Sequence, residues 1–299
     1  MSLIVKPFDP WRSPLCTCPS KYVVHPYTGC GHGCLYCYAS SYIKNFYSPR
    51  PKKFSEIVFV RGLGRVPPGS VIELSTSSDP YTPPEGELKL TREVITKVLA
   101  SGHKLLITTK SSLVVRDLDI LTRYRGRVAV AMTITTLNQE IASVMEPGAP
   151  PPAERLKAVR KLSQAGIPVL VRLDPVVPLV NDDAGDIYKL VIEASKAGAA
   201  QITGSTYKAR LDSLHRLSKA FPQVASELRD IYREGERIGG YLYMDKKKRL
   251  EYMKIVREAA IAAGLAFHTC REGFPELSSK GFSCDGSLLI GRSTFPAKA

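Results

Sequence analysis

The sequence predicts an α/β fold in which a parallel sheet is covered by helices. Short apolar segments that are typical of buried strands alternate with segments whose apolar residues recur at helical spacing. Polar residues collect directly after several of the strand segments, as they do where an active site lies at the carboxyl ends of strands. Alternation of this kind is typical of parallel strands joined by helical crossovers.

Each element follows from the same patterns. The predicted strands are 22–25, 71–75, 104–109, 128–134, 167–173 and 199–203, and the predicted helices are 38–46, 91–101, 116–124, 152–165 and 184–197. Residues 206–263 are predicted to be mainly helical, with a break at Gly239-Gly240, and two short strands are predicted at 265–269 and 287–290. We therefore expect a core at 22–205, an N-terminal extension at 1–21, and a C-terminal helical extension at 206–299 that completes one side of the barrel.

Composition limits the class of protein. The chain has 299 residues, of which 44% are hydrophobic, enough to bury a large core. No basic segment followed by a long apolar run opens the sequence, and no apolar stretch is long enough to cross a bilayer. These features predict a cytoplasmic protein without a membrane partner.

The formal net charge of +14 suggests a polyanionic partner such as DNA or RNA. The alternative is a basic surface that serves only solubility. Basic residues recur at Lys44, Arg50, Lys52, Lys53, Arg61 and Arg65, and again in the run 246–249, which lies close to Tyr241 and Tyr243. Basic side chains beside aromatic rings suit phosphate contact with base stacking, but a solvated helix face explains them equally well.

Three of the seven cysteines form the motif C-x3-C-x2-C at Cys30, Cys34 and Cys37. Three thiolates on one tight loop can hold three irons of a [4Fe–4S] cubane and leave the fourth iron open to a substrate. Glycines at 29, 31 and 33 would let the backbone approach such a bulky group. A zinc site completed by His25 or His32, or three free thiols, is the alternative.

With an aromatic residue before its last cysteine, this motif resembles the signature of the radical S-adenosylmethionine (SAM) superfamily. The chain is most similar to the spore photoproduct lyase-like branch, also described as DNA repair photolyase-like. The similarity is carried by HPYTGCGHGCLYCYAS at 25–40, ELSTSSDPYTPPE at 73–85, TTKSS at 108–112 and the long block at 132–169 that contains Glu146-Pro147-Gly148. It spans about residues 22–200.

The resemblance implies a partial (β/α)6 barrel of the TIM type, a [4Fe–4S] cluster on the three cysteines, and SAM bound at the open iron. It also implies cofactor contacts. Tyr36 matches the position whose backbone meets the adenine, and Ser78 matches a serine that contacts SAM. Lys110 matches a lysine near the SAM carboxylate and ribose, Thr133 matches a strand-terminal serine, and Arg155 belongs to the distinctive block at 132–169. A strand-terminal polar residue that caps its own turn is the alternative for each.

One position departs from the pattern. Spore photoproduct lyase has a cysteine in the segment that matches 73–79, and this cysteine returns a hydrogen atom to the product radical. Thr76 stands there in this chain. We therefore expect a substrate other than the spore photoproduct, with Tyr38, Asp79 and Tyr81 as candidates for catalytic roles.

Cys16 and Cys18 precede the predicted core, and Cys270 and Cys284 lie near the opposite terminus. If the two ends of the barrel meet, these four residues predict a second metal site, either Fe–S or zinc. Four ordinary buried thiols are the alternative.

The sequence therefore predicts an enzyme that cleaves SAM reductively to a 5′-deoxyadenosyl radical and abstracts hydrogen from a nucleic acid or nucleotide. A low-potential donor such as a ferredoxin or flavodoxin would supply the electron. Radical modification of a protein or small metabolite is one alternative, and a non-catalytic nucleic-acid-binding relative is another.

Overall fold

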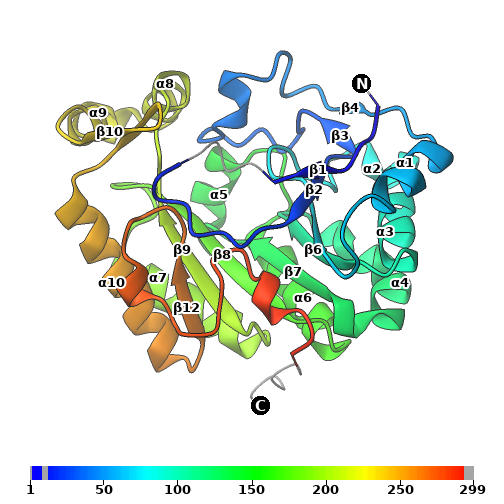
Figure 1. The fold of residues 1–299 in the computed structure, drawn as a ribbon. Helices are drawn as coiled ribbons and strands as arrows, with labels where there is room; N and C mark the ends of the chain where they lie inside the picture. The colour runs from blue at the N-terminus through cyan, green and yellow to red at the C-terminus, as the bar shows by residue number, and fades with distance from the viewer. Residues whose placement is uncertain (1, 9–12, 293–299) are drawn as a thin grey trace.

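An open, mostly parallel sheet forms the centre of the computed structural model, which describes residues 2–8 and 13–292. Its strand order is β1-β2-β5-β6-β7-β8-β9-β12, and every neighbouring pair is parallel except β1 with β2. The strands are β1 (Lys6–Pro7), β2 (Tyr22–Val24), β5 (Val71–Leu74), β6 (Lys104–Thr109), β7 (Val128–Thr133), β8 (Val169–Val176), β9 (Gln201–Thr206) and β12 (Ala266–Thr269). Within the described ranges β1 and β12 do not pair, so the barrel stays open, as the partial barrel predicts (Figure 1).

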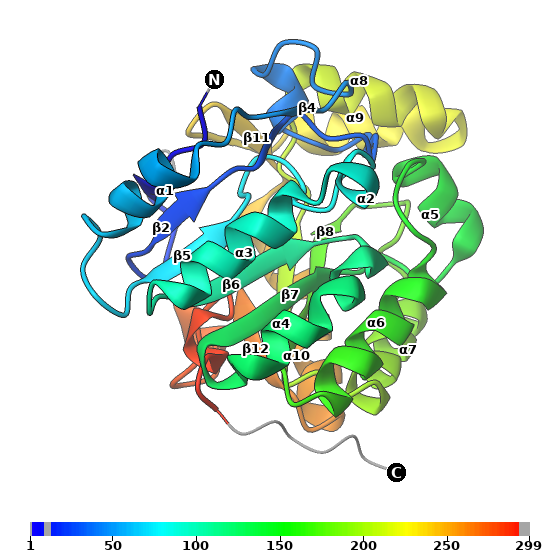
Figure 2. The same cartoon turned by 90° about the vertical axis from the view of Figure 1, so that its right-hand side faces the viewer.

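The α-helices of the described residues are α1 (Glu56–Leu63), α2 (Glu85–Leu88), α3 (Leu90–Ala100), α4 (Leu118–Arg123), α5 (Gln139–Met145), α6 (Pro152–Gln164), α7 (Ala184–Lys196), α8 (Leu211–Ala220), α9 (Ala225–Arg233) and α10 (Lys246–Ala262). Of these, α3, α4, α6, α7 and α10 cover the outer face of the sheet, whereas α8 and α9 lie beyond the carboxyl ends of its strands (Figures 1 and 2). Two small antiparallel pairs complete the described elements: β3 (Tyr27–Thr28) with β4 (Arg50–Pro51), and β10 (Glu236–Ile238) with β11 (Tyr241–Tyr243).

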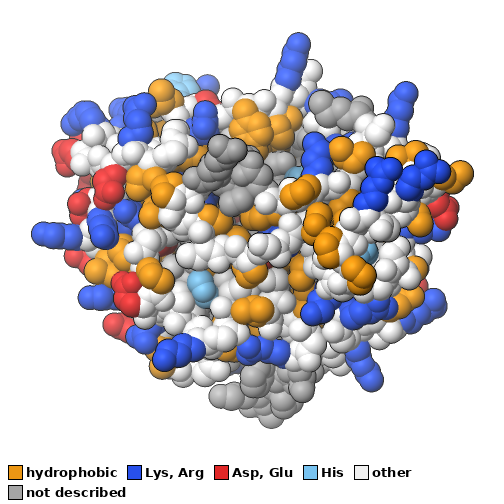
Figure 3. All heavy atoms as spheres, in the orientation of Figure 1, with side chains coloured by type: hydrophobic (Ala, Val, Ile, Leu, Met, Phe, Trp, Pro, Cys, Tyr) orange, Lys and Arg blue, Asp and Glu red, His pale blue; other side chains and the backbone are white. Residues whose placement is uncertain are grey.

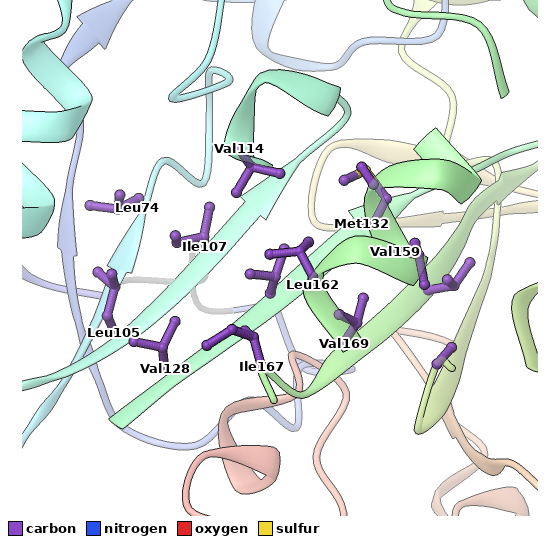
Figure 4. Packing of buried hydrophobic residues seen from close by; sticks show 14 of the residues in the cluster. Leu74, Leu105, Ile107, Val114, Val128, Met132, Val159, Leu162, Ile167 and Val169 are labelled. Atoms are coloured by element: carbon purple, nitrogen blue, oxygen red, sulfur yellow. The ribbon is translucent and has the colours of Figure 1, made fainter. Parts of the chain in front are cut away.

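The strands are apolar on both faces because both faces are buried. Side chains such as Leu105, Ile107 and Val128 point outward and pack against helical residues including Val159 and Leu162 (Figure 4). Burial of both faces explains why the strand segments are nearly continuous apolar runs in the sequence.

The C-terminal segment fills part of the inner face of the open barrel. Leu289 packs there with Leu106, Ala131 and Leu170. Gly286 approaches so closely that an added Cβ would lie 1.9 Å from Leu170 Cδ2. The segment that contains Gly286 and Leu289 therefore fills one end of the barrel, and the polar cavity lies at the other end.

Two expected elements are wrong. Residues 38–46 form only a short 3-10 helix, Ala39–Ser41, and turns. Because the Cys30 amide donates to the Phe46 carbonyl oxygen at 2.7 Å, the chain must return to the cysteine loop, whereas a nine-residue helix would carry it about 13 Å away. The expected strand at 287–290 is a 3-10 helix, Ser287–Leu289, that follows the left-handed Gly286.

The region 206–263 is mainly helical, as expected, through α8, α9 and α10, but the glycine break is a hairpin. Gly239 and Gly240 both have positive φ and join β10 to β11. Left-handed glycine pairs are typical of tight hairpin turns. The strand expected at 265–269 is confirmed as β12.

Among the described residues, no helix is both long enough and apolar enough to cross a membrane.

Candidate active site

A cavity of about 480 Å³ lies where the carboxyl ends of the parallel strands meet. Strands β6, β7, β8 and β9 each contribute residues at or just beyond their last positions. Its wall includes the three motif cysteines, three of the other four cysteines, and most of the predicted cofactor contacts: Cys30, Cys34, Cys37, Cys16, Cys18, Cys270, Tyr36, Ser78, Lys110 and Thr133. The residues that the sequence predicts for the site therefore lie together at this edge of the sheet.

The cysteine loop is held in shape by its own backbone. Gly29 has φ +84°, and an added Cβ would lie 2.4 Å from the Phe46 carbonyl oxygen, so only glycine fits there. The Cys37 amide donates to the Cys34 carbonyl oxygen at 3.2 Å. Gly33 also has positive φ, +68°. These constraints bring three cysteines to one wall of the cavity.

Burial raises the pKa of the Cys30 thiol to about 12 and raises the pKa of Cys34 and Cys37 above their usual range. Burial therefore favours the neutral thiols, and a cationic group such as a metal cluster would be needed to hold them as thiolates. In the described ranges, no three His, Cys, Asp or Glu side chains are arranged to hold a single metal ion. A cubane does not require such convergence, because each cysteine binds a different iron.

The segment 146–148 supports the loop from behind. The Gly148 amide donates to the His32 carbonyl oxygen at 2.9 Å, and His32 Nδ1 lies 3.1 Å from the Gly148 carbonyl oxygen. A Cβ on Gly148 would lie 2.3 Å from the Gly31 carbonyl oxygen. The Glu146-Pro147-Gly148 block therefore packs directly on the cysteine loop.

A buried charge network lies beneath Tyr36. Its hydroxyl donates to Glu146 Oε1, and Arg155 Nη1 lies 2.5 Å from Glu146 Oε2. Arg155 also donates to the Thr133 carbonyl oxygen at 3.2 Å and is not part of the cavity wall. The structure thus places Arg155 behind two predicted cofactor contacts, and its own contact with SAM stays a prediction.

Lys110 extends into the cavity, with its Nζ 5.5 Å from the centre of the Tyr36 ring. Burial alone would lower the pKa of Lys110, but Cys34 and Glu146 raise it above its ordinary value, so the ammonium stays charged. Among the described residues, Lys110 Nζ forms neither a hydrogen bond nor an ion pair within bonding distance. A cation in this position can bind a carboxylate.

Asp79 is fully engaged in holding the site together. Its carboxylate accepts hydrogen bonds from Thr109 Oγ1 at 2.7 Å, the Lys110 amide at 2.8 Å and the Tyr81 amide at 2.9 Å. Its Oδ2 also lies 3.2 Å from His32 Nε2. Burial alone would raise the pKa of Asp79, but His32 and these donors lower it to about 2. Asp79 therefore ties the cysteine loop to the end of β6.

The structure separates the two tyrosine candidates. Tyr38 lines the cavity, and its hydroxyl donates to the Thr76 carbonyl oxygen. Tyr81 is buried outside the cavity wall and donates to Asp117 Oδ2 at 3.0 Å. Of the two, only Tyr38 is in reach of a group bound in the cavity.

Ser75 was not singled out from the sequence. Its hydroxyl is buried and lines the cavity, and no hydrogen-bond partner for it is found in the part of the chain that the structure describes. By contrast, Ser78 Oγ donates to the Tyr27 carbonyl oxygen at 3.3 Å. The left-handed backbone of Ser75, φ +59°, turns the chain at the end of β5, and no sequence signal marks this conformation in a serine.

Three basic residues at the cavity wall were also missed: Arg172, Lys208 and Arg271. Arg172 lies 2.5 Å from Asp174, and Lys208 lies 2.6 Å from Glu272. Within the described ranges Arg271 has no carboxylate partner at ion-pair distance, and its guanidinium lies 6.0 Å from the Tyr38 ring centre and 5.3 Å from that of Tyr241. The sequence signals for these positions are weak. Arg172 interrupts the apolar pattern of β8, Lys208 follows β9, and Arg271 follows β12.

Of the four remaining cysteines, Cys16, Cys18 and Cys270 line the cavity, and Cys284 contacts Cys18. Cys18 Sγ lies 3.3 Å from Cys284 Sγ, although 266 residues separate them in sequence. Burial and Arg172 act in opposite directions on Cys270, whose pKa is lowered to about 7 chiefly by its hydrogen bond with Cys284. The expected meeting of the two chain ends is therefore observed.

Comparison with known proteins identifies the family. The model of the radical SAM superfamily matches residues 24–191, more than half of the chain. The chain belongs to the radical SAM superfamily. Members of this superfamily are enzymes that use a [4Fe–4S] cluster and SAM, which agrees with the three-cysteine loop on the cavity wall.

Relatives of this radical SAM protein occur in distant sources. An uncharacterised protein of Acidianus two-tailed virus is 32% identical over 195 residues, which cover 59% of this chain and 64% of the viral protein. An uncharacterised protein of Mycobacterium tuberculosis strain H37Rv is 29% identical over 238 residues, 73% of this chain and 68% of that protein. The chain thus matches less than two thirds of the length of its viral relative.

Solved structures of spore photoproduct lyase share the fold. A cysteine-to-serine variant superposes with a TM-score of 0.65 at 20% identity, covering 83% of this chain and 75% of the other. The complex of that enzyme with dinucleoside spore photoproduct gives a TM-score of 0.64 over the same shares. At this level of identity the likeness establishes the radical SAM barrel, in line with the open sheet of Figure 1.

Proposed function

We propose that this chain is a radical SAM enzyme that abstracts hydrogen from a nucleotide or nucleic-acid substrate. The observation that carries the proposal is the shared cavity, whose wall holds both the Cys30, Cys34 and Cys37 thiols and the unpaired Lys110 ammonium. When bound there, a reduced [4Fe–4S] cluster supplies the electron that cleaves SAM to methionine and a 5′-deoxyadenosyl radical.

The chain's own residues bind and orient this cofactor pair. The three thiolates hold the cluster, and the Lys110 ammonium binds the SAM carboxylate. The hydroxyls of Ser75, Ser78 and Thr133 offer hydrogen bonds to the amino acid or ribose part, and the backbone at Tyr36 meets the adenine. Glu146 and Arg155 position Tyr36 and the end of β7 from behind.

Burial protects the reaction. Cys30 and Cys34 are 8% and 7% exposed, and the plugged inner face of the barrel closes the cavity from the opposite end. Exclusion of water and oxygen prevents a radical from being quenched before it reaches the substrate.

A nucleotide substrate is supported by two features. Spore photoproduct lyase, which shares the fold, has been solved with dinucleoside spore photoproduct and with AdoMet. In this chain Arg271 offers an unpaired guanidinium beside the Tyr38 and Tyr241 rings, a combination that suits phosphate contact with base stacking. A ferredoxin or flavodoxin would serve as the electron donor.

The substrate is not the spore photoproduct in this proposal. Thr76 lines the cavity where the resemblance calls for a cysteine, and the aliphatic hydroxyl of threonine is a much poorer hydrogen-atom donor than a thiol or a phenol. Tyr38 is the candidate donor, because its hydroxyl adjoins Thr76.

A small metabolite is the second candidate. On the face shown in Figure 3, Lys and Arg side chains are spread around the rim instead of forming one stripe. On this face the distribution gives an extended nucleic acid no continuous track, and a substrate confined to the cavity is consistent with the net charge of +14 as well.

Isotope transfer tests the proposal and separates the candidates. Anaerobically reconstituted protein is mixed with SAM, dithionite and deuterated DNA, RNA or nucleotides, and the 5′-deoxyadenosine is analysed by mass spectrometry. We expect deuterium in 5′-deoxyadenosine from one of these pools and none from a Cys34→Ala control. If SAM is cleaved but only a deuterated metabolite or peptide extract transfers deuterium, the nucleotide assignment is wrong.

A further inference from the structure

The open barrel has two free edges, and cysteines lie at both. Cys16 and Cys18 lie between β1 and β2 at one edge, and Cys270 directly follows β12 at the other. Cys284 belongs to the C-terminal segment that plugs the barrel. In Figure 1 the N-terminal segment crosses in front of the sheet toward this C-terminal segment.

The four thiols form one continuous set of contacts. Cys18 Sγ lies 3.3 Å from Cys284 Sγ, and Cys16 and Cys270 lie close enough to Cys18 and Cys284, respectively, to interact with them. All four are free cysteines. The four thiols come from three separate segments and lie together, whereas ordinary buried cysteines would be expected at scattered positions in the core.

Their backbone is fixed independently of any sulfur contact. The Cys284 carbonyl oxygen accepts hydrogen bonds from Thr203 Oγ1 at 3.0 Å and Arg172 Nη1 at 3.3 Å. The Cys270 amide donates to the Gly204 carbonyl oxygen at 3.0 Å. The ladder of β9 and the loop after β12 thus preorganise these two sulfurs, while the Cys16 amide is held by the Ser13 carbonyl oxygen at 3.0 Å.

Three cations lie beside the set. Arg172 and Arg271 lie close enough to interact with Cys270, and Lys21 with Cys18. Carboxylates pair with two of them: Arg172 with Asp174, and Lys21 with both Asp285 and Glu73. Since four thiolates around zinc or a [4Fe–4S] cluster leave a net negative charge, cationic neighbours stabilise such a centre.

We propose that Cys16, Cys18, Cys270 and Cys284 form a second metal centre with four thiolate ligands, distinct from the SAM cluster and joining the two free edges of the barrel. Soft thiolate sets of four bind zinc or an Fe–S cluster. The centre replaces the missing strand pairing between β1 and β12 and forms part of the cavity wall. It does not depend on the proposed substrate or on SAM cleavage.

In the described residues the Cys18 and Cys284 thiols contact each other, and the four thiols are not arranged around one point. In tetrahedral geometry with Zn–S bonds of about 2.3 Å, the sulfurs lie about 3.8 Å apart. The Cys18–Cys284 contact of 3.3 Å is shorter, so metal binding requires the side chains to turn outward slightly. Rotation about χ1 moves a sulfur while leaving these backbone hydrogen bonds intact.

Metal content without the first cluster tests this centre. The triple variant Cys30→Ala, Cys34→Ala, Cys37→Ala is purified without oxygen, and iron, zinc and sulfide are measured per folded chain. We expect about four irons with sulfide, or about one zinc. A folded triple variant with only trace iron and zinc overturns the proposal, whether or not the wild-type protein cleaves SAM.

A second measurement uses the full wild-type protein, so the test of the second metal centre does not depend on the triple variant being folded. Anaerobic alkylation with mass spectrometry should find Cys16, Cys18, Cys270 and Cys284 protected in the native protein and alkylated after metal chelation. Alkylation of all four before chelation, or a Cys18–Cys284 disulfide detected in place of metal, contradicts the proposal. In the matched variant with serine at these four positions, we expect loss of the second metal and retention of the SAM-dependent spectrum of the first cluster.

Discussion

The Tyr36 hydroxyl donates a hydrogen bond to Glu146 Oε1, 110 residues further along the chain. Arg155 neutralises the same carboxylate from its other side, at 2.5 Å from Oε2. All three residues are buried. The cysteine loop and the helix that follows β7 are thereby joined through a single carboxylate.

Replacing Glu146 with alanine leaves the Arg155 charge buried and unpaired. We expect the free energy of unfolding of the apoprotein to fall by about 3–5 kcal/mol, measured by urea denaturation. Tyr36→Phe removes only one hydrogen bond to this carboxylate, so it should cost less, about 1.5–3 kcal/mol. Equal losses from the two substitutions would contradict the central role of the carboxylate.

Gly148→Ala should disrupt the cysteine loop, because the new Cβ would lie 2.3 Å from the Gly31 carbonyl oxygen. The atoms that this Cβ would meet belong to the backbone of Gly31 and His32, so they cannot move away without distorting the loop. We expect cluster content, measured as iron per chain after reconstitution, to fall severalfold. The matched control is Gly86→Ala in α2, where an added Cβ meets nothing within 4 Å; a similar loss of iron in both variants would refute the explanation.

Lys110→Met removes the unpaired ammonium from the cavity while keeping the length of the side chain. We expect the dissociation constant of SAM to rise on the order of tenfold, the effect of losing one charge-assisted hydrogen bond, with the cluster retained. Calorimetry under nitrogen measures this change. The control is Lys104→Met, at the exposed start of β6, the strand that Lys110 follows. This substitution should leave SAM affinity unchanged.

Asp79 makes the stability of the apoprotein depend on pH in the acid range. Because its folded-state pKa is about 2 and its ordinary value is 3.8, its contribution is complete above pH 4 and is lost as the pH falls toward 2. We expect Asp79→Asn to be about 2 kcal/mol less stable than the wild type at neutral pH. This difference should close between pH 4 and pH 2, as followed by denaturation curves; a difference that stays constant down to pH 2 would show that the charge of Asp79 is not involved.

Periodicity and motif spacing predicted much of this molecule. The strands and helices of the core were predicted because both faces of a parallel strand are buried, which leaves a direct apolar signal in segments such as β7. The cavity was predicted because Lys110 and Thr133 follow strands. The helix at 38–46 was wrong because the return of Phe46 to Cys30 is a long-range backbone contact that local pattern does not record.

The roles of Arg155 and Ser75 lay beyond the sequence for a similar reason. Arg155 is displaced from the cavity by its pairing with Glu146, a partner nine residues earlier whose side-chain direction is set by tertiary packing. Ser75 faces the cavity because of a left-handed backbone conformation that serine seldom adopts. The convergence of Cys18 and Cys284 was expected, but only the fold shows that Cys18 lies at one open edge of the sheet and Cys284 in the C-terminal segment inside the barrel.

Reductive cleavage of SAM is the most direct test of the central claim that the Cys30, Cys34 and Cys37 loop supports radical chemistry. Anaerobically reconstituted protein is incubated with SAM and dithionite, and 5′-deoxyadenosine and methionine are measured by liquid chromatography. We predict that both products form in equal amounts with the wild-type protein and are absent with Cys34→Ala. Formation of no more 5′-deoxyadenosine by a wild-type protein that carries its cluster than by Cys34→Ala would contradict the account.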